Sequence, residues 1–258
     1  MGGIAVQTVF LAVADLTYRR VNLEHAAASA PNMLQSTMLI VLLGLVLLAV
    51  NGPEVTVLGL HPVTYALPVV YAYGLVLSRS AQTEPMWVPQ RTEETREDVP
   101  EEDNAGASPA RLTAQFLALA AVVGGTGYAV AQAGLAVAAQ TGLSGTVVGA
   151  LMTGVVTSLP ELVTVLAAVR AGALTLAVGD IVGGNTFDVL FIAVADVAYD
   201  GSIYHAVDDR TRFLLVLSIV LTGVLTAGLL HRARKGIGFE GVSILLVYAV
   251  GVWVLLSG

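Results

Sequence analysis

Eight apolar segments make up most of this chain, and each is long enough, or nearly so, to form a helix across a bilayer. The third and fourth segments are separated by residues 79–111, a polar stretch with eight acidic residues and several prolines. We therefore predict an all-α polytopic membrane protein whose two halves are joined by a solvated linker. The predicted spans lie near residues 2–18, 34–50, 56–78, 112–138, 145–169, 173–199, 212–230 and 240–257.

Composition agrees with this pattern. The 258 residues are 56% hydrophobic and 12% charged, with a mean hydropathy of +0.80, which excludes an ordinary soluble domain. Because the chain has no cysteine, a disulfide framework and a thiolate metal site are also excluded. The sequence has neither a phosphate-binding glycine loop nor a nucleophile–His–acid arrangement, so we expect no enzyme. With a net charge of −7 we expect the lipid bilayer, and no nucleic acid, as a partner.

Three carboxylates lie inside two of the predicted spans. Glu161 is in the segment 145–169, and Asp180 and Asp188 are in the segment 173–199. A carboxylate at the centre of a membrane helix costs roughly 2.5 to 3.5 kcal/mol on insertion scales, so three of them need a compensating partner. A bound cation is the obvious one.

The first of these segments predicts a broken helix with oxygen ligands beside the break. Pro160 has no N–H to donate to the carbonyl of Val156, so the helix should break or kink in mid-membrane. Thr157 and Ser158 lie four and three residues before Glu161, which places two hydroxyls and one carboxylate on one face. Such hard oxygen ligands suit Na⁺, Ca²⁺ or Mg²⁺.

In the second segment a Gly-Gly-Asn sequence, residues 183–185, lies between Asp180 and Asp188. Paired glycines in a membrane helix permit either close helix packing or a second break. Asn185 can be an ion ligand or the cap of a half-helix, and the sequence leaves both open. Asp15 and Asp196 lie near segment ends, where we expect hydrated carboxylates outside the site, and we expect the histidines to be solvated as well.

The sequence TSLPEL at 157–162, followed by GDIVGGNTFD at 179–188, resembles the second α-repeat of the sodium/calcium exchangers, in the cation/calcium antiporter superfamily. The resemblance implies an inverted-repeat fold of ten helices, with ion sites on broken helices 2, 3, 7 and 8. By position, Thr157, Ser158 and Glu161 match ligands of helix 7, and Asp188 matches the ligand of helix 8. The chain departs from the family pattern at Asp180, where members usually have Asn, and at Gly184, where they usually have Ser.

An internal repeat supports the same fold. Residues 2–18 match residues 183–199 at a shift of 181, with eight of seventeen positions identical. The pair Tyr71-Ala72 likewise parallels Tyr248-Ala249, so the first three apolar segments repeat the last three. In this register Gln7 corresponds to Asp188 and offers an amide oxygen in place of a carboxylate.

The register also predicts the division of the chain. Counterparts of residues 112–182 would precede Met1, so the chain lacks family helices 1 and 2 and part of helix 3. A true truncation, a start further upstream, and a second chain that supplies these helices all remain open. The expected parts are 1–78, an incomplete first half with the later part of helix 3 and helices 4 and 5; 79–111, an acidic cytoplasmic linker; and 112–258, a complete second half (helices 6–10) with its α-repeat at 145–199.

The basic residues predict the orientation. Alternate loops divide the twelve Lys and Arg residues unequally, with only Arg210 and Arg212 on one side. The positive-inside rule therefore places the linker 79–111 in the cytoplasm and the C-terminus outside the cell membrane.

Together these features predict a secondary antiporter that exchanges a divalent cation, which we expect to be Ca²⁺, for Na⁺, with no resident cofactor. H⁺/cation exchange is an alternative, which Gln7 favours, and a truncated protein that binds a cation without transport is another. The predicted ion ligands are Glu161, Asp188, Thr157, Ser158, Asn185, Asp180 and Gln7.

Overall fold

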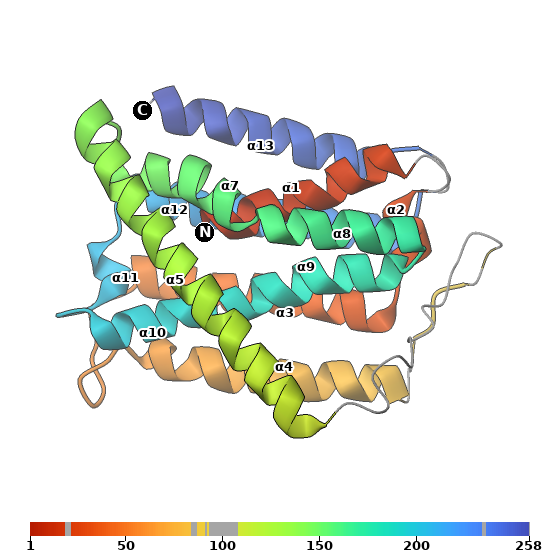
Figure 1. The fold of residues 1–258 in the computed structure, drawn as a ribbon, viewed down its shortest axis with the longest axis horizontal. Helices are drawn as coiled ribbons and strands as arrows, with labels where there is room; N and C mark the ends of the chain where they lie inside the picture. The colour runs from red at the N-terminus through yellow and green to blue at the C-terminus, as the bar shows by residue number, and fades with distance from the viewer. Residues whose placement is uncertain (19–21, 84–86, 91, 93–107, 234–235, 258) are drawn as a thin grey trace.

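The structure, a computed structural model, describes residues 1–18, 22–83, 87–90, 92, 108–233 and 236–257 (Figure 1). This part of the chain is helical and contains no strand beyond one isolated bridge between Val57 and Leu60. The helices are α1 (Gly2–Thr17), α2 (Leu23–Ala27), α3 (Ala30–Asn51), α4 (Pro62–Thr83), α5 (Pro109–Thr141), α6 (Gly145–Val147), the π-helix η1 (Val148–Thr153), α7 (Gly154–Thr157), α8 (Leu159–Ala171), α9 (Leu174–Asp188), α10 (Leu190–Ala198), α11 (Ile203–Ala206), α12 (Asp209–His231) and α13 (Phe239–Ser257).

Each of the eight predicted segments forms a helix or a run of helices, but fewer than eight meet the length and hydropathy of a membrane span. Among the described residues, α3, α5, α9 with α10, α12 and α13 qualify, and the bent run from α6 to α8 is a sixth candidate. The helix α1 is apolar but has only 16 residues. The helix α4 carries three tyrosines and Arg79, which lower its hydropathy. The chain is therefore an all-α polytopic membrane protein with five or six clear spans in its described part.

The helices lie side by side from α13 at one edge to α4 at the other, with α1, α9 and α3 between them (Figure 1). Two apolar clusters hold this arrangement together. One joins α1, α2, α8, α9, α12 and α13, and the other centres on α3, α4, α10 and α11. The helix α1 contacts α7, α8, α9, α12 and α13, so the residues from the start of the chain lie in the middle of the bundle.

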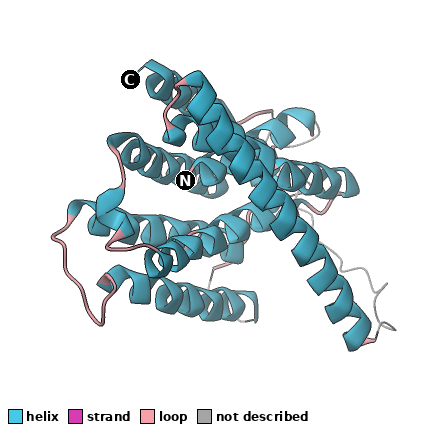
Figure 2. Ribbon diagram, turned by 60° about the vertical axis from the view of Figure 1, so that its left-hand side comes forward, coloured by secondary structure: helices cyan, strands magenta, loops and turns pink. Residues whose placement is uncertain are grey.

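The long helix α5 lies outside this bundle. It crosses the other helices obliquely and touches η1, α6 and α7 near its C-terminal end (Figures 1 and 2). None of its 33 residues is buried, and its exposed side chains include Phe116, Val123 and Tyr128. Exposed apolar side chains around a helix are expected where lipid tails are the solvent.

Two short helices correct the prediction for the segment ends. α2 and α11 fold back over the ends of α1 and α10, and Asp15 and Asp196 are 4% and 0% exposed instead of hydrated. His25 and His61 are also buried, contrary to expectation. Each aspartate accepts a hydrogen bond from the first backbone N–H of the short helix above it, at 2.6 Å for Leu23 to Asp15 and 2.9 Å for Ile203 to Asp196.

The predicted linker 79–111 is helical at both edges, where α4 continues to Thr83 and α5 begins at Pro109. Most of the stretch between them lies outside the described residues. The division into 1–78, 79–111 and 112–258 stays a prediction.

Candidate ion-binding site at two interrupted helices

The first interruption is at Ser158. This residue ends α7 and precedes α8 with φ −94° and ψ 1°, and the two halves of the span differ in direction by 42°. The helix breaks two residues before Pro160, because the proline at the second position of α8 needs no hydrogen bond from its nitrogen there. The break predicted from the proline is confirmed, and it places Glu161 in the first turn of α8.

The second interruption, at Val189 after Asp188, is slight, because this residue keeps αR backbone angles and α9 and α10 together form one span. The helix α9 continues unbroken through Gly183–Asn185 and ends at Asp188, and α10 starts at Leu190. The paired glycines therefore do not break the helix. The Gln35 side chain lies 3.6 Å from where a Cβ of Gly183 would be, so at this glycine a side chain of another helix packs closely. Asp188 thus lies at the last residue of α9, and Glu161 lies in the first turn of α8.

The helix α1 packs against both interrupted helices. The Nε2 of Gln7 donates to the Ser158 hydroxyl at 3.2 Å, which joins α1 to the first break. The Nδ2 of Asn185 donates to the Ile4 carbonyl at 3.4 Å, which joins α1 to α9. Ile4 and Asn185 are repeat counterparts, so equivalent positions of the two halves contact each other where α1 and α9 meet.

Close approach of backbones makes these contacts possible. A Cβ on Gly154 would lie 3.1 Å from the Gly3 nitrogen and 3.2 Å from the Gly2 carbonyl carbon. A Cβ on Gly2 would overlap the backbone of Ala150. Small residues therefore set the distance between α1 and the first broken span, as they do in other tightly packed membrane helices.

Five of the seven predicted ligands lie around the junction, which we define as the place where α1 meets α9 and the break at Ser158. Ser158, Asn185 and Gln7 are buried, at 1%, 1% and 5% exposure. The Glu161 Oε2 and the Asn185 Oδ1 are buried atoms without a hydrogen-bond partner, so both remain free to bind a cation. The carboxylate of Asp188 is partly buried and interacts electrostatically with that of Glu161.

The other two predicted ligands are placed differently. The Thr157 hydroxyl is exposed and donates to carbonyls of its own helix, at 2.9 Å for Thr153 and 3.3 Å for Gly154. Asp180 is exposed and accepts from the Thr164 hydroxyl at 3.2 Å. The structure does not bring either side chain to the Gln7–Ser158 contact, and the roles of all seven residues stay predictions.

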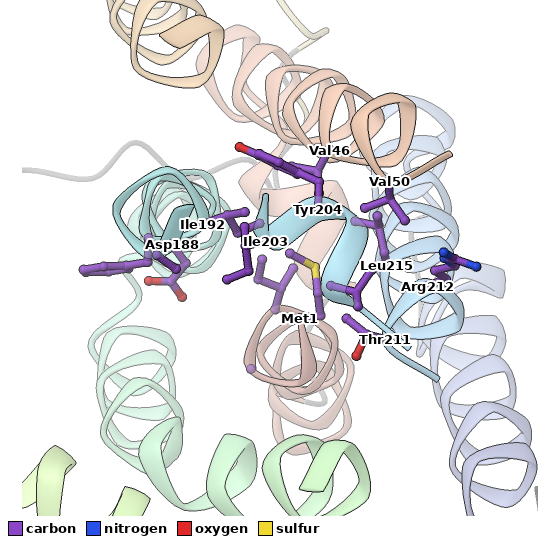
Figure 3. A pocket seen from close by; sticks show the side chains of 15 residues that line it. Met1, Val46, Val50, Asp188, Ile192, Ile203, Tyr204, Thr211, Arg212 and Leu215 are labelled. Atoms are coloured by element: carbon purple, nitrogen blue, oxygen red, sulfur yellow. The ribbon is translucent and has the colours of Figure 1, made fainter. Parts of the chain in front are cut away.

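Asp188 also lines a cavity of about 340 Å³, which Glu161, Ser158, Asn185 and Gln7 do not line (Figure 3). Asp188 and Arg212 lie at opposite sides of this cavity, with Met1, Ile203 and Tyr204 between them. Apart from these two charged side chains, most of the lining is aliphatic or aromatic. In the described ranges, no group of three or more His, Cys, Asp or Glu side chains is arranged to hold a metal ion. An ion bound between Glu161 and Asp188 would therefore need hydroxyl, amide or backbone oxygens as further ligands.

Comparison with known proteins decides the family. The family described as sodium/calcium exchanger protein matches residues 112–257, more than half of the chain. The chain belongs to this family. The bent run from α6 to α8 and the span formed by α9 and α10 both lie inside the matched region.

A curated relative is the sodium/calcium exchanger MaX1 of Methanosarcina acetivorans. It is 28% identical to this exchanger-family chain over 141 residues, which are 54% of the chain and 39% of MaX1. The alignment thus spans less than half of the relative's length. No solved structure matches the chain.

One group of functional candidates was missed by the sequence analysis. Asp15, Glu24 and Glu240 come from three different helices and are buried together near the α2 end of α1. The internal repeat gives no signal for this group, because at a shift of 180 Glu24 corresponds to Tyr204 and only His25 of residues 23–25 is identical to its counterpart, His205.

Proposed function

We propose that the protein is a secondary antiporter that exchanges a divalent cation, Ca²⁺, for Na⁺ across the cell membrane. The observation that carries the proposal is the position of Glu161 at the bend of one membrane span, where it interacts electrostatically with Asp188 at the end of α9 in the other span. Family membership and the name of MaX1 support ion exchange.

The chemistry of the junction suits this exchange. Two carboxylates in a low-dielectric setting repel each other when the site is empty, and a cation removes that cost. The Ser158 hydroxyl, the free Asn185 oxygen and the Gln7 amide oxygen add neutral hard ligands. Either one Ca²⁺ or Na⁺ ions can balance the charge, so the half-helices would rearrange only when occupied. This condition couples the two ion flows.

H⁺/cation antiport is the second candidate. It is favoured by Gln7, a neutral amide at the repeat counterpart of Asp188, which is buried and hydrogen-bonded to Ser158. With one carboxylate fewer, protons alone could neutralise the site.

Flux in proteoliposomes separates these functions. Proteoliposomes that contain the purified protein are loaded with ⁴⁵Ca²⁺. Release of ⁴⁵Ca²⁺ is then measured under a Na⁺ gradient at fixed pH, and separately under a pH gradient without Na⁺. The proposal predicts release driven by the Na⁺ gradient. Release driven only by the pH gradient would establish proton coupling. Calcium that binds but is released by neither gradient would favour a binding role, or a requirement for a second chain that supplies further helices.

The proposed orientation has a direct test, because the chain has no cysteine of its own. We expect a membrane-impermeant maleimide to label Ser257→Cys on intact cells and to label Ser108→Cys only after the cells are permeabilised. Ser257 is the last residue of α13 and Ser108 precedes α5. The opposite labelling pattern would reverse the proposed topology.

A further inference from the structure

Three carboxylates that are separate from the candidate ion site are buried together at the other end of α1. We call Asp15 of α1, Glu24 of α2 and Glu240 of α13 the acidic cluster. Their exposures are 4%, 0% and 0%. Burying even one carboxylate without a partner is costly, so three together require an explanation.

Only two of the six carboxylate oxygens of the acidic cluster have a hydrogen-bond partner. The Asp15 Oδ1 accepts from the Leu23 N–H at 2.6 Å, and the Glu240 Oε1 accepts from the Asn22 Nδ2 at 2.6 Å. The Asp15 Oδ2, the Glu240 Oε2 and both oxygens of Glu24 are buried and have no partner. Glu24 is therefore a fully buried carboxyl group that faces two more carboxylates, and its own backbone N–H and the Asn22 side chain, its favourable polar neighbours, fall short of good hydrogen-bond geometry.

The space around Glu240 is made by two glycines. A Cβ on Gly228 of α12 would lie 2.5 Å from the Glu240 Cγ, and a Cβ on Gly238 would overlap the carboxyl group. The side chain of Glu240 thus fits between two backbones that have no side chains of their own. This fit shows that its buried position is built into the fold.

The other half of the molecule shows the same architecture without the extra acids. There Asp196 is the counterpart of Asp15, and Tyr204 takes the place of Glu24. The Asp196 Oδ2 accepts from the Thr64 hydroxyl at 2.5 Å, and that hydroxyl also contacts the Tyr204 hydroxyl at 3.1 Å. One carboxylate with neutral partners is therefore enough to keep the short helix α11 packed against the end of α10.

Among the described residues, the charged groups nearest the acidic cluster have partners outside it. The His25 ring contacts the Arg232 carbonyl and the Thr92 hydroxyl, both at 2.9 Å. The Arg232 guanidinium donates to the carbonyls of Gln90 and His25. The helix α9, which packs against α2, contributes apolar side chains there, and its Asp180 is exposed. No described basic side chain forms an ion pair with the cluster.

We propose that the acidic cluster is a proton-binding site, in which a proton held on Glu24 keeps α2 docked against α1 and α13. The described residues include no metal-ligand group of three acidic or histidine side chains, so a proton fits these carboxyls better than a metal ion. A proton on Glu24 removes one of three negative charges and provides an O–H donor for the unpaired oxygens. Without it, three charges share one dry site and repel each other, which loosens α2. This proposal does not rest on the proposed antiport.

Burial and the neighbouring charges also favour the protonated form of Glu24. Burial, followed by the negative charges of Asp15 and Glu240, raises the pKa of Glu24 to about 8. Because the folded protein holds this proton more tightly than the unfolded chain, the stabilisation is fully present below the ordinary pKa of 4.5. It is lost as the pH rises through about 8.

The test follows thermal unfolding of the purified protein over the pH range from about 5 to about 9. The native protein should lose melting temperature as pH rises through this range, and Glu24→Gln should remove that loss because it carries no charge at any pH. Glu240→Gln removes a charge that raises the Glu24 pKa, so in this variant the loss of melting temperature should begin at a lower pH than in the native protein.

Infrared titration of the carboxyl groups gives the midpoint directly. The native protein should show a protonated carboxyl band that disappears as pH rises through about 8, and Glu24→Gln should lack this band. In Glu240→Gln the same band should disappear at a lower pH, since one of the charges that hold the proton on Glu24 is gone. This variant keeps the test decisive if Glu24→Gln does not fold. Glu54→Gln, which changes an exposed acid in the α3–α4 loop, is the matched control and should titrate like the native protein. A native protein without a protonated carboxyl group at neutral pH, or a band that is unchanged in Glu24→Gln, would overturn the proposal.

Discussion

Neutralising either carboxylate at the interrupted helices, by Glu161→Gln or Asp188→Asn, is expected to reduce sodium-driven calcium exchange at least about 30-fold. Removing one charged partner from a buried charge pair costs about 2 to 5 kcal/mol, or roughly 30- to 4,000-fold in affinity. Both substitutions keep an oxygen in place, so the loss reports on charge and not on the size of the side chain. The measurement is the initial rate of ⁴⁵Ca²⁺ release from proteoliposomes under a Na⁺ gradient.

Two further variants make this result interpretable. Glu54→Gln removes a carboxylate of the same kind from an exposed loop and should exchange at the native rate. Asp180→Asn removes an exposed carboxylate that accepts from Thr164, and its effect should stay below about tenfold, because exposed charges contribute little. Exchange at the native rate in Glu161→Gln would remove this residue from the ion path.

A large side chain at Gly154 is expected to separate α1 from the first broken span. In Gly154→Leu the new Cβ would meet the Gly3 nitrogen at 3.1 Å and the Gly2 carbonyl carbon at 3.2 Å, and the rest of the side chain would need still more room. Overpacking of this kind costs about 1 to 3 kcal/mol. The melting temperature in detergent should fall, and exchange should fall with it because the contact between Gln7 and Ser158 depends on this spacing.

Gly149→Leu provides the matched control, in the same span. A Cβ at Gly149 has no neighbour within 4 Å, so this variant gains the helix propensity of leucine without a clash. Its melting temperature should equal or exceed that of the native protein. Equal stability of Gly154→Leu and Gly149→Leu would show that the glycine contact with α1 does not set the spacing.

Much of the fold could be predicted from local sequence. Apolar runs gave all eight helical segments, since a membrane helix must be apolar along most of its length. Pro160 predicted the break next to Glu161, because a missing N–H acts on its own helix. The shift of 181 residues paired Ile4 with Asn185, and the hydrogen bond between these residues now joins the two halves.

Other features depend on tertiary contacts that no local pattern reveals. The helices α2 and α11 have only five and four residues, too few for a periodic signal, yet they bury Asp15 and Asp196. The contact between Gln7 and Ser158 joins residues 151 positions apart. Thr157 was placed beside the break correctly, but its hydroxyl bonds to its own helix, as threonine in a helix often does.

Competition between Ca²⁺ and Na⁺ for the purified protein tests the central claim most directly. Equilibrium binding of ⁴⁵Ca²⁺ is measured at fixed pH with increasing Na⁺, in the native protein and in Glu161→Gln. We predict that Na⁺ displaces bound Ca²⁺ from the native protein and that Glu161→Gln binds at least about 30-fold more weakly. Calcium binding that is unaffected by Na⁺ and unchanged in Glu161→Gln would contradict a shared ion site at the interrupted helices.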